Sequence, residues 1–255
     1  MAIWKDYHLI KGLEVSKGGA VRRTYDDCRT WSGKGEPKLL TRKTFSDGNV
    51  YVEIRVPEKK KLRVDELVAK CFYKDVARTS IEQTFIIHKD GDKTHCWANN
   101  LQWATPYEHG LFYQNDPFVN TSDGYRLVKD EVYISKEGKV KVNGEVLNVY
   151  DSFFDSDMDR EAAVDPFVFI EEERRRVRFY IDENVAAAFL PKPDEIKYPA
   201  LLHIDNDYKN YSLDNLKWVK DDSEEYVLYL EKKTADIEKR IEELNPHPIK
   251  HLMIG

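Results

Sequence analysis

The sequence predicts an α+β fold with two tandem lobes, each containing a small sheet, a helix and a compact hairpin unit, followed by a C-terminal helix. Three observations support this prediction. A histidine-containing segment occurs twice at one internal spacing, short alternating stretches precede a helical stretch in each half, and the last segment has helical apolar spacing. The predicted boundaries are 1–110 for the first lobe, 111–222 for the second and 223–255 for the C-terminal helix and tail.

The duplicated segment is the most informative feature of the chain. Its copies span residues 86–103 and 201–218, and in each a histidine is followed twelve residues later by an asparagine. The two pairs are His88 with Asn100 and His203 with Asn215. A strand end, a polar turn and a short helix would bring imidazole and carboxamide together, which suits metal-assisted phosphodiester cleavage with histidine as general base. The same residues also fit a structural role, because asparagine and aspartate often cap their own turns.

The elements before each copy follow the same plan. In the first lobe, residues 50–56 alternate as a strand does, and residues 63–72 have helical spacing. In the second lobe, residues 177–181 predict a strand and residues 183–189 a helix that ends before Pro191. We expect residues 59–61 at a hairpin tip. Residues 151–165 are expected to form a solvated acidic insertion, because the carboxylates at 155–161 do not match a calcium loop.

The C-terminal segment predicts a helix that stops at Asn245-Pro246. Its apolar or small residues alternate at spacings of three and four, at positions 227, 230, 234, 237, 241 and 244. Because the stripe is shorter than three heptads, packing against the second lobe is the expected role. Self-association through residues 223–245, or binding of a partner helix, is the alternative.

Several motifs resemble a known family. The stretch 3–22 contains Trp-Lys and Val-Ser-Lys-Gly segments, and 64–72 contains Leu-Val-Ala; residues 132–140 and 182–189 echo them in the second lobe. Together with the duplicated segment, these motifs resemble the HNH homing endonucleases of phages and mobile introns, with the small module that precedes their nuclease motif. The resemblance spans roughly residues 3–105 and 125–219. It implies that each lobe ends in an HNH-like ββα unit.

The resemblance also implies roles for site residues. His88 and His203 would be the catalytic residues that activate water. A divalent cation such as Mg²⁺ would be held in each lobe by an asparagine, with a nearby aspartate as a substitute ligand. These metal ligands are Asn100, Asn215, Asp90 and Asp205.

The chain departs from the family at positions that matter for chemistry. Ile87 and Leu202 stand where the family usually has a metal-binding Asp, Asn or His, and an aliphatic side chain offers no lone pair to a hard cation. Asp65 and Asp182 stand where the family often has histidine. We therefore expect a degenerate active site and impaired catalysis. An active metal-dependent endonuclease that cleaves DNA is the alternative.

Charge separates the two lobes. The chain has a formal net charge of −6, but residues 1–110 contain 20 Lys and Arg against 15 Asp and Glu, which leaves 20 against 31 for the remainder. The protein is therefore expected to act either by binding DNA through the first lobe or by binding a host protein through the acidic second lobe, as an inhibitor or DNA mimic. The candidate phosphate contacts are Arg22, Arg23, Arg42, Lys43, Lys59, Lys60, Lys61 and Arg63.

Cysteine usage and hydropathy bound the setting. The cysteines at 28, 71 and 96 are odd in number and lack paired spacing, so a disulfide framework is not expected. Zinc binding by His88, His95, Cys96 and His109 is disfavoured because the spacing matches no standard site. The chain shows no targeting signal and no apolar run of membrane-spanning length. We expect a protein of the cytoplasm, the host cytoplasm if phage-encoded, with no membrane partner.

Overall fold

The chain forms two compact units, Met1–Val119 and Asn120–Gly255, which we describe separately. The computed structural model describes residues 2–24, 37–55, 59–76, 78–80, 82–155, 160–172, 175–193, 195–196 and 199–245. The tail at 246–255 and Cys28 lie outside these ranges, as do residues 156–159 of the predicted acidic insertion.

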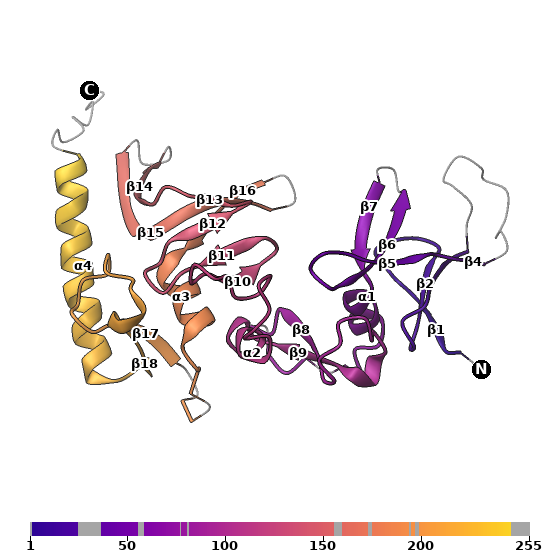
Figure 1. The fold of residues 1–255 in the computed structure, drawn as a ribbon. Coiled ribbons are helices and arrows are strands. Elements are labelled where there is room, and N and C mark those ends of the chain that lie inside the picture. Colours follow the sequence, from indigo (N-terminus) through magenta and orange to yellow (C-terminus); the bar gives the residue numbers. More distant parts are fainter. Residues whose placement is uncertain are drawn as a thin grey trace, which may run out of the picture. The chain divides into compact units, whose positions relative to one another are not determined.

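The first unit contains three antiparallel sheets and two helices (Figure 1). Its sheets have the strand orders β1-β2-β3-β4, β5-β6-β7 and β8-β9. The elements are β1 (Trp4–Asp6), β2 (Leu13–Ser16), β3 (Val21–Arg23), β4 (Lys38–Leu39), β5 (Arg42–Thr44), β6 (Val50–Arg55), β7 (Lys59–Arg63), α1 (Val64–Cys71), β8 (Phe85–His88), the 3-10 turn η1 (Ala98–Asn100), β9 (Leu101–Ala104) and α2 (Pro106–Phe112).

The core of the first unit forms because its strands and its helix each present one apolar face. In β6, Val50, Val52 and Ile54 are buried and alternate with more exposed residues, as a half-buried strand requires. Helix α1 buries Leu67 and Val68 against β2 and β6. This packing fixes the position of the β8-β9 hairpin, which contacts α1 through β9 and η1.

The second unit has the same order of sheet types and helices (Figure 1). Its sheets have the orders β10-β11-β12-β13, β14-β15-β16 and β17-β18. The elements are β10 (Arg126–Lys129), β11 (Val132–Ile134), β12 (Val140–Val142), β13 (Glu145–Val146), β14 (Tyr150–Asp155), β15 (Arg160–Glu172), β16 (Arg175–Tyr180), α3 (Ile181–Phe189), β17 (Pro199–His203), the 3-10 turn η2 (Leu213–Asn215), β18 (Leu216–Lys220) and α4 (Glu224–Leu244).

The C-terminal helix α4 follows the second hairpin as α2 follows the first. Ser223 caps its start by accepting a hydrogen bond from the backbone of Tyr226, and the helix contacts β15 and β17. Tyr229 is its one buried side chain among the described residues, whereas Val227 and Leu230 are 46% and 41% exposed. The expected apolar stripe is therefore exposed in the first turns of the helix, whereas its later members Ile237, Ile241 and Leu244 are half-buried.

The mixed α+β class with small antiparallel sheets is confirmed, but two local predictions were wrong. Lys59, Lys60 and Lys61 lie in strand β7, paired with β6, and not at a hairpin tip. The expected solvated insertion at 151–165 instead contributes to β14 and β15. These two strands pair with each other, and Tyr150 lies opposite Phe167. The prediction was based on the acidic residues of this stretch, but the phenylalanines and the valine between them favour strand.

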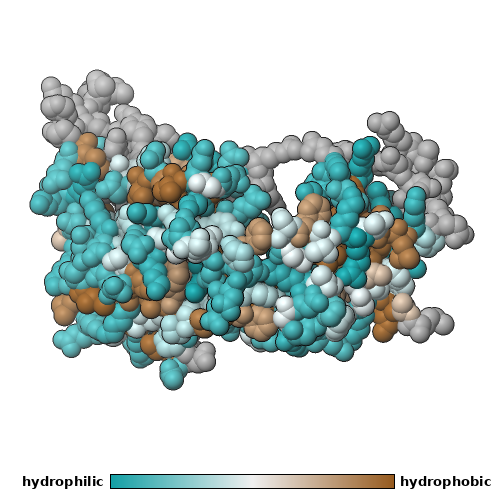
Figure 2. Space-filling view, viewed as in Figure 1, coloured by the Kyte–Doolittle hydropathy of each residue, from teal (hydrophilic) through white to brown (hydrophobic). Residues whose placement is uncertain are grey.

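On the face shown in Figure 2, hydrophilic residues cover most of both units and hydrophobic residues form small separate patches. Among the described residues, no helix is both long and apolar enough to cross a membrane.

Candidate functional site

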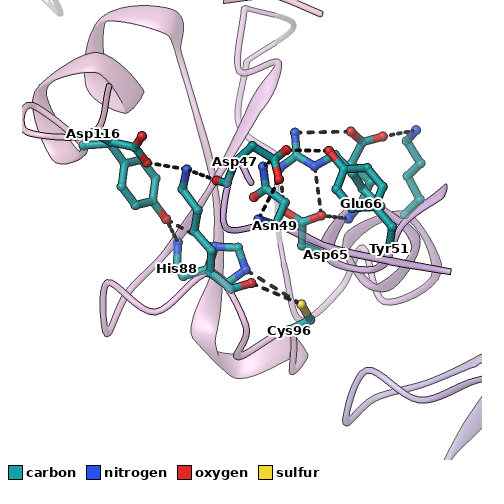
Figure 3. Close-up of polar contacts among 12 residues, drawn as sticks. Asp47, Asn49, Tyr51, Asp65, Glu66, His88, Cys96 and Asp116 are labelled. Carbon is teal, nitrogen blue, oxygen red and sulfur yellow. Dashed lines mark hydrogen bonds and ion pairs between the residues drawn. The ribbon is translucent and has the colours of Figure 1, made fainter. Parts of the chain in front are cut away.

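His88 ends strand β8 and is buried at 1% exposure. Its backbone N–H donates to the Tyr113 hydroxyl at 3.0 Å, and its Nδ1 lies 3.2 Å from the same oxygen. Its Nε2 faces the Cys96 sulfur at 4.0 Å (Figure 3). Burial lowers the pKa of His88, so the ring is neutral at pH 7. Both nitrogens thus face protein groups, and no ring edge is presented to solvent.

His203 occupies the corresponding end of strand β17 and is also 1% exposed. Its Nδ1 lies 2.7 Å from the Tyr229 hydroxyl of α4. Its Nε2 has no hydrogen-bond partner among the described residues and lies 3.8 Å from an Asp182 oxygen. Burial lowers the pKa of His203 to about 4.

The two tyrosines were missed by the sequence analysis. Tyr113 lies 25 residues after His88, and Tyr229 lies 26 residues after His203. The similar spacing in the two units was the available sequence signal, but each tyrosine lies beyond the duplicated segment, at the end of α2 or within α4. In each unit the tyrosine ties that helix to the histidine, because the hydroxyl can donate to Nδ1 and so place the ring proton on Nε2.

The first hairpin loop does not offer the ligand set that the family resemblance implies. The Asn100 carboxamide oxygen accepts from the Asp90 backbone, and its nitrogen donates to Asp90 and to the His95 carbonyl. The other Asp90 oxygen lies 2.7 Å from His95 Nδ1. These bonds, led by the one from Asn100, hold the pKa of Asp90 at about 2. The two side chains therefore brace the loop.

The second hairpin loop repeats this bracing. The Asn215 oxygen accepts from the Asp205 backbone at 3.0 Å, and its nitrogen donates to Asp205 and to the Asn210 carbonyl. Asn210 in turn donates to the second Asp205 oxygen at 2.6 Å. Across the described residues, no group of three or more His, Cys, Asp and Glu side chains is arranged to hold a metal ion. In both loops the asparagine and the aspartate that were expected to hold a divalent cation are hydrogen-bonded to each other.

A cavity of about 730 Å³ adjoins the first loop. Four aspartates contribute to its lining, at positions 47, 90, 92 and 116. The one cation that lines it, Lys93, pairs with Asp116 at 2.5 Å and donates to the Asp47 carbonyl. A cavity with this charge repels a phosphodiester.

A glycine turn packs against each hairpin loop. Gly19 has φ +83°, and an added Cβ would lie 2.8 Å from the Cys96 carbonyl oxygen. Gly138 has φ +76°, and its Cβ would lie 2.2 Å from the Tyr211 ring. The neighbouring carbonyls of Lys17 and Lys136 accept from the first residue of each 3-10 turn. The Val-Ser-Lys-Gly segments therefore dock directly on the two loops.

Most candidate phosphate contacts lie on the sheet β5-β6-β7. Cross-strand pairs put Lys43, Lys59, Lys61 and Arg63 on the solvent face, opposite the buried valines of β6. Arg55 shares this face and was missed, although its alternation with Tyr51 and Glu53 was a usable signal. Glu53 pairs with Lys43 and Lys59, both at 3.1 Å. Lys61 lies 4.2 Å from the centre of the Phe45 ring.

Arg63 and Arg22 also form ion pairs with carboxylates of the protein. Arg63 pairs with Asp65 at 2.6 Å and with Glu66, so its guanidinium is committed to the protein (Figure 3). Arg22 pairs with Glu14 and lies 4.0 Å from the centre of the Trp4 ring.

The remaining candidate phosphate contacts are Arg23, Arg42 and Lys60. Arg23 donates to the Arg55 carbonyl, and Arg42 donates to the Thr94 carbonyl at 2.8 Å while remaining exposed. Lys60 is exposed on β7. The structure thus gathers Arg42, Lys60 and Lys61 near one sheet.

Comparisons with known proteins give one structural likeness. No protein-family model matches the chain, and no curated protein matches it. A solved structure described as DNA binding and cleavage by the HNH homing endonuclease I-HmuI is similar, with 22% sequence identity and a TM-score of 0.36. The match covers 55% of this chain and 76% of that chain. The case for function rests on the side-chain geometry above.

Proposed function

We propose that the protein binds nucleic acid through its first unit and does not cleave it. One observation carries this proposal: both motif histidines are 1% exposed and each has its Nδ1 against a buried tyrosine hydroxyl. A general base must come within about 3 Å of the proton it removes, directly or through one water. Each imidazole is enclosed by protein at 1% exposure, so a phosphate or a water can reach it only if the surrounding residues move.

The surroundings of the first histidine also argue against cleavage. The adjoining cavity is acidic, and Asn100 and Asp90 are bound to the loop itself. A phosphate there would meet four aspartates, and the lining cation Lys93 is already paired with Asp116. The active endonuclease is therefore the less favoured alternative.

The basic sheet supports the binding part of the proposal. Lys61 of β7 and Arg55 of β6 lie on one face of the sheet, whereas Lys60 and Arg42 stand opposite Ile54 and Val52 and so belong to its other face; all four residues are exposed. Each phosphate neutralised by such a cation releases counterions, which makes binding salt-dependent. A bound cation such as Mg²⁺ is not needed for this function.

The shared element order supports common ancestry of the two units. Each has a four-stranded sheet, a three-stranded sheet, a helix, a hairpin with a 3-10 turn and a final helix. With the sequence motifs, this order favours a duplicated scaffold of HNH endonuclease type that has kept its fold and lost its chemistry.

The test is salt-dependent binding of labelled DNA and RNA to the full chain, followed by fluorescence anisotropy. We expect affinity to fall with salt, and the Lys60→Ala/Lys61→Ala double variant to reduce the slope of log K against log salt by about 2. The matched control is Arg175→Ala/Arg176→Ala, which removes two exposed cations from the corresponding strand β16 of the second unit. This control should keep the wild-type slope.

Two results would overturn the proposal. One is wild-type protein that binds no nucleic acid at low salt. The other is binding that the two double variants weaken equally, because the first unit would then have no special role. The acidic second unit remains a candidate surface for a host protein, and labelled nucleic acid displaced by that protein would reveal competition.

A further inference from the structure

Trp97 is an exposed aromatic residue on the first hairpin loop. It is 40% exposed, and its ring centre lies 4.5 Å from that of His95 at an interplanar angle of 32°. Exposing a tryptophan forgoes a large apolar burial. The fold does not need this ring, because the second unit builds the same loop with Ser212 at the corresponding position, also just before its 3-10 turn.

The loop holds this aromatic pair in place. Asp90 fixes His95 Nδ1 at 2.7 Å, and Asn100 donates to the His95 carbonyl at 2.9 Å. Asp92 accepts from both the backbone and the hydroxyl of Thr94. A side chain already ordered loses little conformational entropy when a ligand stacks on it.

Cations lie on both sides of Trp97 along the loop. Arg42 donates to the Thr94 carbonyl at 2.8 Å, and Lys89 donates to the Asn99 carbonyl at 3.1 Å. Arg42 belongs to β5, so the loop adjoins the sheet that carries the other exposed cations. An aromatic platform beside cations that follow a backbone is the arrangement that binds single strands without sequence preference.

We propose that Trp97 is a stacking site for an unpaired nucleobase, so that the protein prefers single-stranded or locally opened nucleic acid to duplex. The inference rests on the proposed binding function and deepens it. In a duplex both faces of each base are covered by neighbouring bases, whereas an unpaired base has a face free for the indole. The second unit, with serine at this place, offers no such platform.

The experiment measures the affinity of the full chain for labelled oligo-dT, oligo-U and a mixed-sequence duplex, each of about 12 nucleotides. Trp97→Ala is expected to weaken binding of the single strands about tenfold and to leave duplex binding unchanged. Trp97→Phe keeps an aromatic face and should retain most of the affinity. The matched control is Tyr73→Ala, which removes another exposed aromatic side chain of the same unit. Circular dichroism confirms that each variant is folded.

The outcomes separate the two proposals. If single strands bind wild type and Trp97→Ala equally while Lys60→Ala/Lys61→Ala weakens both, nucleic-acid binding holds and stacking is wrong. Equal losses in Trp97→Ala and Trp97→Phe would also contradict stacking. If wild type binds none of the oligonucleotides at low salt, both proposals fall.

Discussion

The two units hold the same buried aspartate in opposite electrostatic settings. Asp65 is the second residue of α1 and pairs with Arg63 at 2.6 Å. Asp182 is the second residue of α3, but Tyr180 stands where the first unit has arginine. Burial therefore raises the pKa of Asp182 to about 6. The common backbone tolerates both solutions, which indicates that the fold around the histidines is kept by packing more than by charge.

The contact with the turn glycine differs in a similar way. In the first unit Gly19 faces the backbone carbonyl of Cys96, and in the second Gly138 faces the Tyr211 side chain. The geometry is shared, whereas the atoms beside the loop are not. An active site would instead require the same side chains to be held in fixed positions near the histidine of each unit.

The largest expected effect comes from the two glycines. Gly19→Ala and Gly138→Ala should each cost roughly 3 kcal/mol in the free energy of unfolding, from a positive φ and a steric overlap. Tyr211→Ala should relieve part of the second loss, with a coupling of about 1–2 kcal/mol. Cys96→Ala should relieve none of the first, because the overlapping carbonyl remains. Chemical denaturation of the double variants measures both couplings, and equal couplings would contradict this difference.

The next effect concerns the two aspartates. Asp65→Asn should destabilise the first unit by about 3 kcal/mol, because it removes the nearer of the two carboxylates that pair with Arg63. Asp182→Asn should stabilise the second unit at pH 8 by about 1–3 kcal/mol, since it removes a buried carboxylate with a raised pKa. Both variants keep an oxygen for the backbone bond to the next residue. Denaturation at pH 8 gives both values, and a loss of stability in Asp182→Asn would refute the comparison.

Acidification should separate the units. Burial lowers the pKa of His88, and lowers that of His109 to about 3, so both stabilise the fold above pH 6.5 and this contribution is lost as the pH falls below it. In the second unit the loss from His203, with a pKa of about 4, is opposed by Asp182. The raised pKa of Asp182 gives stability that is full below pH 3.8 and disappears as the pH rises through about 6.

The first unit should therefore unfold first between pH 6 and 4. Indole N–H signals in NMR spectra can follow this transition, because Trp103 reports on the first unit and Trp218 on the second. Simultaneous loss of the two signals would contradict the expected order.

The smallest effect concerns the tyrosines. Tyr113→Phe removes the acceptor of the His88 backbone N–H as well as the partner of Nδ1, so it should cost about 2 kcal/mol. Tyr229→Phe removes the hydrogen bond between the tyrosine hydroxyl and His203 Nδ1 and should cost about 1 kcal/mol. Thermal unfolding compares them. A larger loss in Tyr229→Phe would reverse the ranking.

Much of the fold could be predicted because its signals are local. The alternation at 50–56 became β6, the helical spacing before Phe72 became α1, and the C-terminal pattern became α4, ending before Asn245 as expected. The prediction for the acidic stretch at 151–165 was wrong because it gave more weight to the charged residues than to the strand-forming residues between them. Strand β15 pairs with both β14 and β16, and a pattern within one strand does not reveal which strands will pair.

The site was harder to predict for a physical reason. Spacing identified His88 and Asn100, but a side chain's role depends on where its polar atoms point. Asn100 bonds its own loop, and His88 faces a tyrosine from the following helix. The commitment of Arg63 to Asp65 likewise required the three-dimensional neighbours. In the sequence, the departures from the family pattern at Ile87, Leu202, Asp65 and Asp182 were the indications of a degenerate active site.

The most direct test of the account is a nicking assay on supercoiled plasmid with Mg²⁺ or Mn²⁺. It compares wild type with His88→Ala and His203→Ala under conditions where binding is demonstrated. We predict that wild-type protein binds the plasmid and leaves the nicked fraction equal to that of the protein-free control. Wild-type nicking that one histidine variant abolishes, with binding intact, would contradict the account and identify the working unit.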